Sequence, residues 1–137
     1  MVAPQFVLKF HQEKFSMKKL VFIADDDKDI LEIITLILKM RGYDVQTTTN
    51  ANILFNLPHG AKPDLIILDI WMAGIDGRDI FVKIKKDGYF DSIPILFMSA
   101  SAQLDEIIKQ YPAEGYIAKP FEMDYLISTV SETMQHS

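Results

Sequence analysis

Short apolar runs alternate with longer segments of helical periodicity from Met17 to the end of this 137-residue chain. The runs have the length and residue types of buried strands, whereas the longer segments repeat apolar residues every three or four positions. Strands are predicted at Leu20–Ala24, Asp44–Thr48, Leu65–Leu68, Ile93–Met98 and Tyr116–Ala118. Helices are predicted at Ile30–Met40, Asn50–Leu57, Arg78–Lys86, Ser101–Gln110 and Met123–Met134.

Strands that alternate with helices predict the α/β class, with a parallel sheet covered on both faces. Right-handed crossovers leave few topologies for such a sheet. Its ligand site lies beyond the carboxyl ends of the strands, where the strand order changes direction. At the first helix, Asp27 or Asp29 is expected to cap the start and Gly42 to mark the end.

Composition narrows the function classes. The net charge of -5 argues against a basic nucleic-acid-binding face, and the chain contains no cysteine, which excludes disulfides, thiolate zinc sites and cysteine nucleophiles. No apolar run approaches the length that a membrane span needs. We therefore expect a cytoplasmic protein that binds neither nucleic acid directly nor membranes.

The chain divides into two parts. Residues Met1–Ser16 lack a signal-peptide core and a cleavage site, so we interpret them as an N-terminal leader: a tag, an upstream start or a flexible extension. Residues 17–137 are expected to form one domain, since their length suits a single core.

Acidic residues crowd the end of the first predicted strand. The apolar run that ends at Ala24 is followed by Asp25, Asp26, Asp27 and Asp29. Two carboxylates about 4 Å apart repel by roughly 4 kcal/mol at an effective dielectric of about 20. Either these side chains spread apart into water, or a cation bound among them removes the repulsion.

Three further strand ends carry polar residues that suit phosphoryl transfer. Asp69 ends the third strand, Ser99 the fourth, and Lys119 follows the fifth. Mg²⁺ prefers oxygen ligands, which Asp25, Asp26, Asp69 and a backbone carbonyl just after Asp69 could supply. Asp69 ends the most apolar strand and is the candidate nucleophile, while Ser99 and Lys119 are candidates for binding phosphoryl oxygens.

In this order and spacing, the sequence resembles the receiver domains of two-component response regulators. The resemblance is carried by the Asp25-Asp26 pair, "LIILDIWMAGIDG", "MSA" and "AKPF", and covers nearly all of residues 17–137. It implies a doubly wound five-stranded parallel sheet of the flavodoxin-like, CheY-like type with strand order 2-1-3-4-5. It also implies that Asp69 accepts a phosphoryl group from a phosphohistidine, with Mg²⁺ held by Asp25, Asp26, Asp69 and the backbone carbonyl of Trp71.

The same resemblance assigns further roles. Ser99 and Lys119 would contact the phosphoryl group, and Lys119-Pro120 would be a cis peptide. Tyr116 would be the switch aromatic that remodels the face formed by the fourth helix, fifth strand and fifth helix. The implied partners are a sensor histidine kinase or phosphotransfer protein, a downstream protein target, and a second copy in a phosphorylation-dependent homodimer. The protein would be a signalling switch rather than a turnover enzyme.

Three features depart from the family pattern. Ala73 stands where a proline is usual, so we expect a less rigid loop after Asp69. Trp71 is bulky at a position that often controls water access, so an altered phosphoryl lifetime is expected. The segment between residues 101 and 114 is short, which predicts a truncated or tilted fourth helix.

Other site types fit the acids less well. An EF-hand starting at Asp25 would need glycine at Ile30 and glutamate at Leu36. A phosphatase of the haloacid dehalogenase type would need a second aspartate where Trp71 stands. A receiver-like protein-binding module that works without phosphorylation remains the alternative.

Overall fold

A computed structural model of the chain describes residues 18–57, 61–100 and 102–135; the expected leader, Met1–Ser16, lies outside them. The described elements are, in order, β1 (Leu20–Ala24), α2 (Lys28–Met40), β2 (Asp44–Thr48), η1 (Ala51–Asn56), β3 (Leu65–Asp69), β4 (Trp71–Met72), β5 (Ile75–Asp76), α3 (Gly77–Lys86), β6 (Ile95–Ser99), α4 (Leu104–Gln110), β7 (Gly115–Ala118) and α5 (Met123–Gln135).

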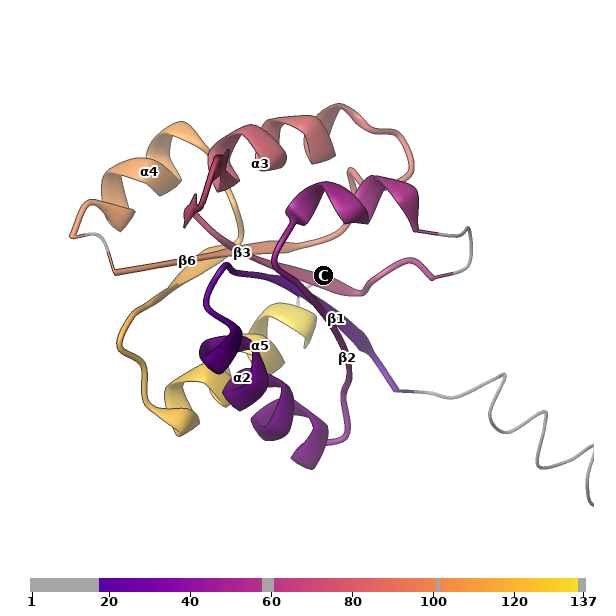
Figure 1. Cartoon of the computed structure of the whole chain (residues 1–137), viewed down its shortest axis with the longest axis vertical. Helices are drawn as coiled ribbons and strands as arrows, with labels where there is room; N and C mark the ends of the chain where they lie inside the picture. The colour runs from indigo at the N-terminus through magenta and orange to yellow at the C-terminus, as the bar shows by residue number, and fades with distance from the viewer. Residues whose placement is uncertain (1–17, 58–60, 101, 136–137) are drawn as a thin grey trace, which may run out of the picture.

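The main sheet confirms the predicted fold. In the described residues it has five parallel strands in the order β2-β1-β3-β6-β7. Since β4 and β5 pair only with each other, this is the predicted order 2-1-3-4-5. Helices α2 and α5 cover one face of the sheet, and η1, α3 and α4 cover the other (Figure 1). The direction of strand order changes between β1 and β3, where a doubly wound sheet places its ligand site.

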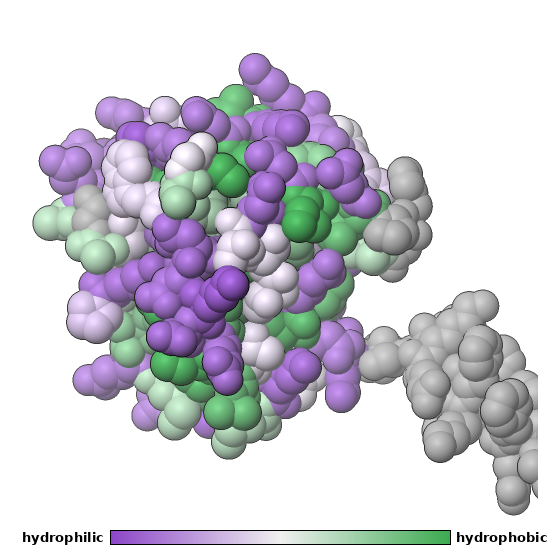
Figure 2. All heavy atoms as spheres, viewed as in Figure 1, coloured by the Kyte–Doolittle hydropathy of each residue, from purple (hydrophilic) through white to green (hydrophobic). Residues whose placement is uncertain are grey.

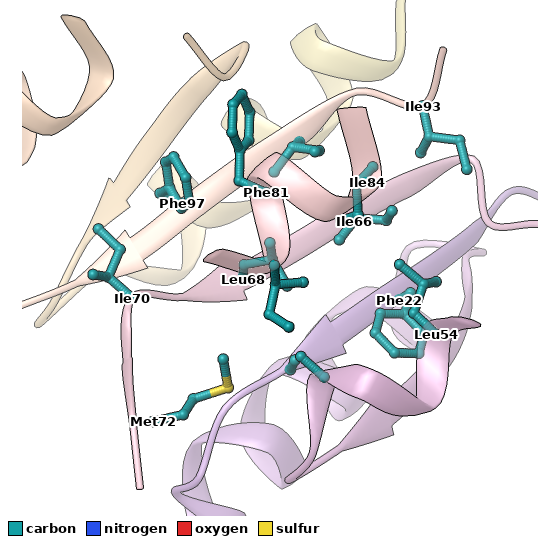
Figure 3. Packing of buried hydrophobic residues seen from close by; sticks show 14 of the residues in the cluster. Phe22, Leu54, Ile66, Leu68, Ile70, Met72, Phe81, Ile84, Ile93 and Phe97 are labelled. Carbon is teal, nitrogen blue, oxygen red and sulfur yellow. The ribbon is translucent and has the colours of Figure 1, made fainter. Parts of the chain in front are cut away.

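Alternation along the strands builds two cores. Val21 and Ile23 of β1 pack with the α2 and α5 side, whereas Phe22 and Ala24 pack with the side of η1, α3 and α4. Figure 3 shows the second cluster, in which Phe22 lies near Leu54 of η1. All residues of β3 and β6 are buried, so polar side chains enter these strands only at their carboxyl ends.

The start of α2 is capped as the sequence predicts. The side chain of Asp27 accepts hydrogen bonds from the backbone N–H groups of Asp29 at 3.0 Å and Ile30 at 3.3 Å. Of the two candidates, Asp27 is therefore the N-cap. The helix ends at Met40, and Gly42 follows with φ of +91°, a conformation that favours glycine.

Two predicted helices are shorter than expected. The segment Asn50–Leu57 contains a 3₁₀ helix at Ala51–Asn56 rather than an α-helix. Leu57 is extended, as residues before proline usually are, which limits the helix to its short length. The fourth helix begins at Leu104 instead of Ser101, which lies outside the described residues, and its seven residues confirm the predicted truncation.

Among the described residues, no helix combines the length and apolar character needed to cross a membrane.

Candidate functional site

The strand ends bring the predicted polar residues to one edge of the sheet. Asp25 directly follows β1, Asp69 ends β3, Ser99 ends β6 and Lys119 directly follows β7. The register places Asp69 beside Met98 and Ser99 beside Ala118. The parallel sheet therefore gathers residues that are far apart in sequence, as expected.

Three carboxylates converge at this edge. Asp25, Asp26 and Asp69 each offer an oxygen atom, and these atoms lie within 4.8 Å of one another. Asp25 and Asp69 are buried, whereas Asp26 is exposed. An all-oxygen donor set that is open on one side suits a hard divalent cation that keeps part of its water shell. The residues present fit Mg²⁺.

Lys119 partly compensates the negative charge. Its Nζ atom lies 2.7 Å from Oδ2 of Asp25 and 3.3 Å from Oδ2 of Asp69. Its backbone N–H donates to the carbonyl of Ser99 at 2.9 Å, and the following peptide bond, Lys119-Pro120, is cis as predicted. The side chain of Lys119 thus reaches across the end of the sheet to β1 and β3.

Burial and charge shift the ionisation of this cluster. Burial, together with the negative charge of Asp25, raises the pKa of Asp69 to about 6, although Lys119 acts in the opposite direction. Burial alone would lower the pKa of Lys119, but its hydrogen bond to Asp25 and the charges of Asp69 and Asp25 raise it overall. At neutral pH the lysine is therefore charged and Asp69 is mostly ionised.

The backbone beside Asp69 is closely packed by Gly77. A Cβ atom on Gly77 would collide with the carbonyl oxygen of Asp69. The N–H group of Gly77 also donates to the carbonyl of Ile70 at 2.8 Å. The absence of a side chain at Gly77 is what lets α3 start against the end of β3.

A small hairpin, which the hydrophobic pattern of the sequence does not predict, follows Asp69. Trp71 pairs with Asp76, and Met72 with Ile75, in antiparallel β4 and β5. The tight turn could have been recognised from Gly74, which has φ of +72°. The hairpin begins two residues after Asp69, so it lies next to the acidic cluster.

A ring contact and an ion pair fix the hairpin to α3. The guanidinium of Arg78 lies 4.6 Å from the centre of the Trp71 ring and 2.6 Å from Oδ2 of Asp76. The hydrogen bond from Arg78 lowers the pKa of Asp76, whose side chain also caps α3 through the Arg78 N–H. Trp71 as a residue is 54% exposed. Sequence reasoning identified Trp71 but missed Arg78.

Tyr116, the predicted switch residue, is tied to α4. Its hydroxyl donates to Oδ1 of Asp105 at 2.7 Å, and this bond raises the pKa of Tyr116. The hydroxyl of Tyr125 donates to the backbone carbonyl of Tyr116 at 3.3 Å. Strand β7 is therefore linked to both α4 and α5. Nothing in the sequence pattern identified Asp105 as a partner.

The roles of the candidate residues stay predictions. Ser99 is buried at the end of β6, where its hydroxyl was expected. Metal binding by the backbone carbonyl of Trp71 likewise stays a prediction.

Comparison with known proteins identifies the family. The sequence model described as the response regulator receiver domain matches residues 21–131. The chain is 34% identical over 117 residues to the nisin biosynthesis regulatory protein NisR of Lactococcus lactis, covering 84% of this chain and 50% of that protein. It is also 29% identical over 119 residues to the DNA-binding dual master transcriptional regulator RpaA of Synechocystis, and this match covers 85% of this chain and 49% of RpaA. The chain thus spans about half the length of these relatives.

Solved structures with a similar fold also include response regulators. The response regulator TrrA of Thermotoga maritima, solved in complex with Mg²⁺-BeF, is similar with a TM-score of 0.73 and 27% identity over 84% of this chain and 98% of that one. The chemotaxis protein CheY4 of Vibrio cholerae shares the fold, with a TM-score of 0.76 and 24% identity. The match covers 85% of this chain and 98% of CheY4. With the family model matching most of its length, this chain belongs to the response regulator receiver family.

Proposed function

We propose that this receiver domain accepts a phosphoryl group on Asp69 in a two-component phosphorelay. The observation that carries the proposal is a buried carboxylate at the end of β3, beside two more carboxylates and a lysine. An oxygen of Asp69 attacks the phosphorus atom of a phosphohistidine, and the nitrogen–phosphorus bond breaks as the imidazole leaves with its electron pair. A pKa of about 6 leaves this oxygen mostly ionised at neutral pH.

Asp25, Asp26, Asp69 and the backbone carbonyl of Trp71 would hold Mg²⁺. When bound, the ion supplies positive charge that stabilises the phosphoryl oxygens. The Lys119 ammonium, which already contacts two of the carboxylates, would move onto an oxygen of the product, and the Ser99 hydroxyl would bind another. The presence of Mg²⁺ in the similar TrrA complex supports this choice of metal.

The output is a change in conformation rather than a released product. We infer that engagement of Ser99 by the phosphoryl group draws Tyr116 inward and breaks its bond to Asp105. This would alter the surface formed by α4, β7 and α5, and a downstream protein or a second phosphorylated copy would read the change. Such a switch needs two packings that differ by only a few kcal/mol.

A protein partner suits the exposed face of α2. Ile33, Leu36 and Met40 are 54%, 65% and 75% exposed, and their spacing places them along one helix face. Figure 2 shows a mostly hydrophilic surface with hydrophobic residues near its lower edge, around α2. Exposed apolar patches of this kind often mark protein interaction sites. The proposed phosphoryl donor is a sensor histidine kinase or a phosphotransfer protein, and we propose that the domain itself acts in the cytoplasm.

Direct nucleic-acid binding is not proposed for this domain. RpaA is named as a DNA-binding regulator, but the chain spans only about half of that protein. The acidic balance of the present sequence suits protein partners better than a nucleic-acid backbone.

The test is intact-mass analysis after incubation with acetyl phosphate and Mg²⁺. Wild type is expected to gain one phosphoryl group, whereas Asp69→Asn or wild type with EDTA should gain none. Mg²⁺ binding without any adduct would contradict the proposed chemistry and favour the phosphorylation-independent protein-binding module.

A further inference from the structure

The carboxylate of Asp26 is held by a backbone group of the β4–β5 hairpin. Its Oδ2 atom accepts a hydrogen bond of 3.1 Å from the N–H group of Ala73, which is 47 residues away in sequence. Lys119 contacts the other two carboxylates of the cluster, Asp25 and Asp69. The exposed member of the cluster is thus fixed from the hairpin side.

The turn that carries this N–H group has a defined geometry. Met72 pairs with Ile75, so Ala73 and Gly74 form a two-residue turn. Gly74 has φ of +72°, and no described residue other than glycine has a positive φ. A negative φ followed by a positive φ is the pattern of a type II turn, in which proline is favoured at the first central position. Proline would therefore suit the backbone at Ala73, but it has no N–H to donate.

We propose that the Ala73 N–H group positions Asp26 for the divalent cation. The hydrogen bond engages one carboxylate oxygen and leaves the other available as a ligand. In this arrangement the ligand atoms of Asp25, Asp26 and Asp69 already converge within 4.8 Å. An exposed side chain held before binding loses less conformational freedom when the ion arrives. The inference rests on the Mg²⁺ site of the proposed function, and it assigns Ala73 a positioning role.

The test compares Ala73→Pro with Ala73→Ser, which keeps the N–H group at the same exposed position. Calorimetric titration of the full chain with Mg²⁺ is expected to show about threefold to tenfold weaker binding for Ala73→Pro, the effect of freeing one side chain. Ala73→Ser should bind as wild type does. Asp26→Ala alone should bind Mg²⁺ more weakly, so its titration is extended to higher Mg²⁺ concentration. Adding Ala73→Pro to Asp26→Ala should cause no further loss of Mg²⁺ affinity.

Several results would overturn the inference. Equal or tighter Mg²⁺ binding by Ala73→Pro would show that the hydrogen bond does not assist the ion. The same loss in the Asp26→Ala background would show that proline acts through the turn instead. If Ala73→Pro does not fold, the amide proton resonance of Ala73 in the metal-free protein decides, because it should move upfield in Asp26→Ala; an unchanged resonance rejects the bond.

The same measurements distinguish a failure of the proposed function from a failure of the positioning role of Ala73. If wild type binds no Mg²⁺, both the metal site and this inference fall. If wild type binds Mg²⁺ and is phosphorylated while Ala73→Pro matches it in affinity, only the positioning role falls.

Discussion

The ammonium group of Lys119 lies 2.7 Å from a carboxylate oxygen of Asp25, which is fully buried. This ion pair joins the ends of β7 and β1, two strands that are separated in the sheet by β3 and β6. A buried carboxylate that is ionised needs a positively charged partner, and the ammonium group of Lys119 supplies that charge to Asp25.

Replacing Lys119 should therefore destabilise the metal-free protein. Lys119→Met removes the positive charge that lies beside the two buried carboxylates of Asp25 and Asp69. We expect the free energy of unfolding at pH 7 to fall by about 2 kcal/mol. This loss is smaller than that for a fully buried ion pair, because the lysine is partly exposed. Urea denaturation in EDTA measures the loss. Mg²⁺ should stabilise the variant more than it stabilises wild type. Equal Mg²⁺ effects would contradict the shared role of the lysine and the cation.

The raised pKa of Asp69 predicts a pH-dependent stability of the metal-free protein. Its carboxyl group binds a proton more tightly when folded, with a pKa of about 6 against an ordinary value of 3.8. The folded state is therefore favoured at low pH, and this contribution is lost as pH rises from about 4 to 6. Relative to Asp69→Asn, wild type should lose about 2 kcal/mol of unfolding free energy across that interval.

Urea denaturation of both proteins in EDTA, at pH 4, 5, 6 and 7.5, measures this difference. Titrating groups that do not interact with Asp69, such as Asp76, are common to the two proteins and cancel in the comparison. A difference that stays constant with pH would show that the Asp69 carboxyl group is not perturbed by its burial.

The sequence predicts the strand ends well because their cause is local. Buried strands are apolar throughout, so a polar residue such as Asp69 or Ser99 marks the point where a strand leaves the core. The contacts between loops are not local. Two examples are the hydrogen bonds from Ala73 to Asp26 and from Tyr116 to Asp105. They depend on how separate segments pack against each other, which the hydrophobic pattern of the sequence does not indicate. Resemblance to the family implied roles for Asp26 and Tyr116 but did not identify Ala73 and Asp105 as their partners.

Removal of the Tyr116 hydroxyl should loosen α4. Tyr116→Phe keeps the ring and deletes the hydrogen bond to Asp105 in the first turn of that short helix. We expect amide hydrogen exchange in residues 104–110 to rise about threefold, because local opening no longer breaks this bond. Mass spectrometry of peptides from α2 in the same sample gives the control. Unchanged exchange in α4 would mean that the bond contributes nothing to holding the helix.

The contact between Gly77 and Asp69 predicts a strong effect from a single methyl group. In Gly77→Ala the new Cβ atom would overlap the carbonyl oxygen of Asp69, so the end of β3 or the start of α3 must shift. We expect a loss of about 1–3 kcal/mol in the free energy of unfolding, as for other overpacked sites. Mg²⁺ affinity should also fall, since the displaced backbone carries a carboxylate of the cluster.

Gly88→Ala is the matched control for this prediction. A Cβ atom on Gly88 would meet no atom within 4 Å, and its φ is not in the left-handed region. Its unfolding free energy should stay within about 0.5 kcal/mol of wild type, with unchanged Mg²⁺ affinity. If Gly77→Ala and Gly88→Ala behave alike in denaturation and in Mg²⁺ titration, the close approach of α3 to Asp69 does not constrain the site. If Gly77→Ala alone loses both stability and affinity, the geometry of the acidic cluster depends on the packing of this glycine.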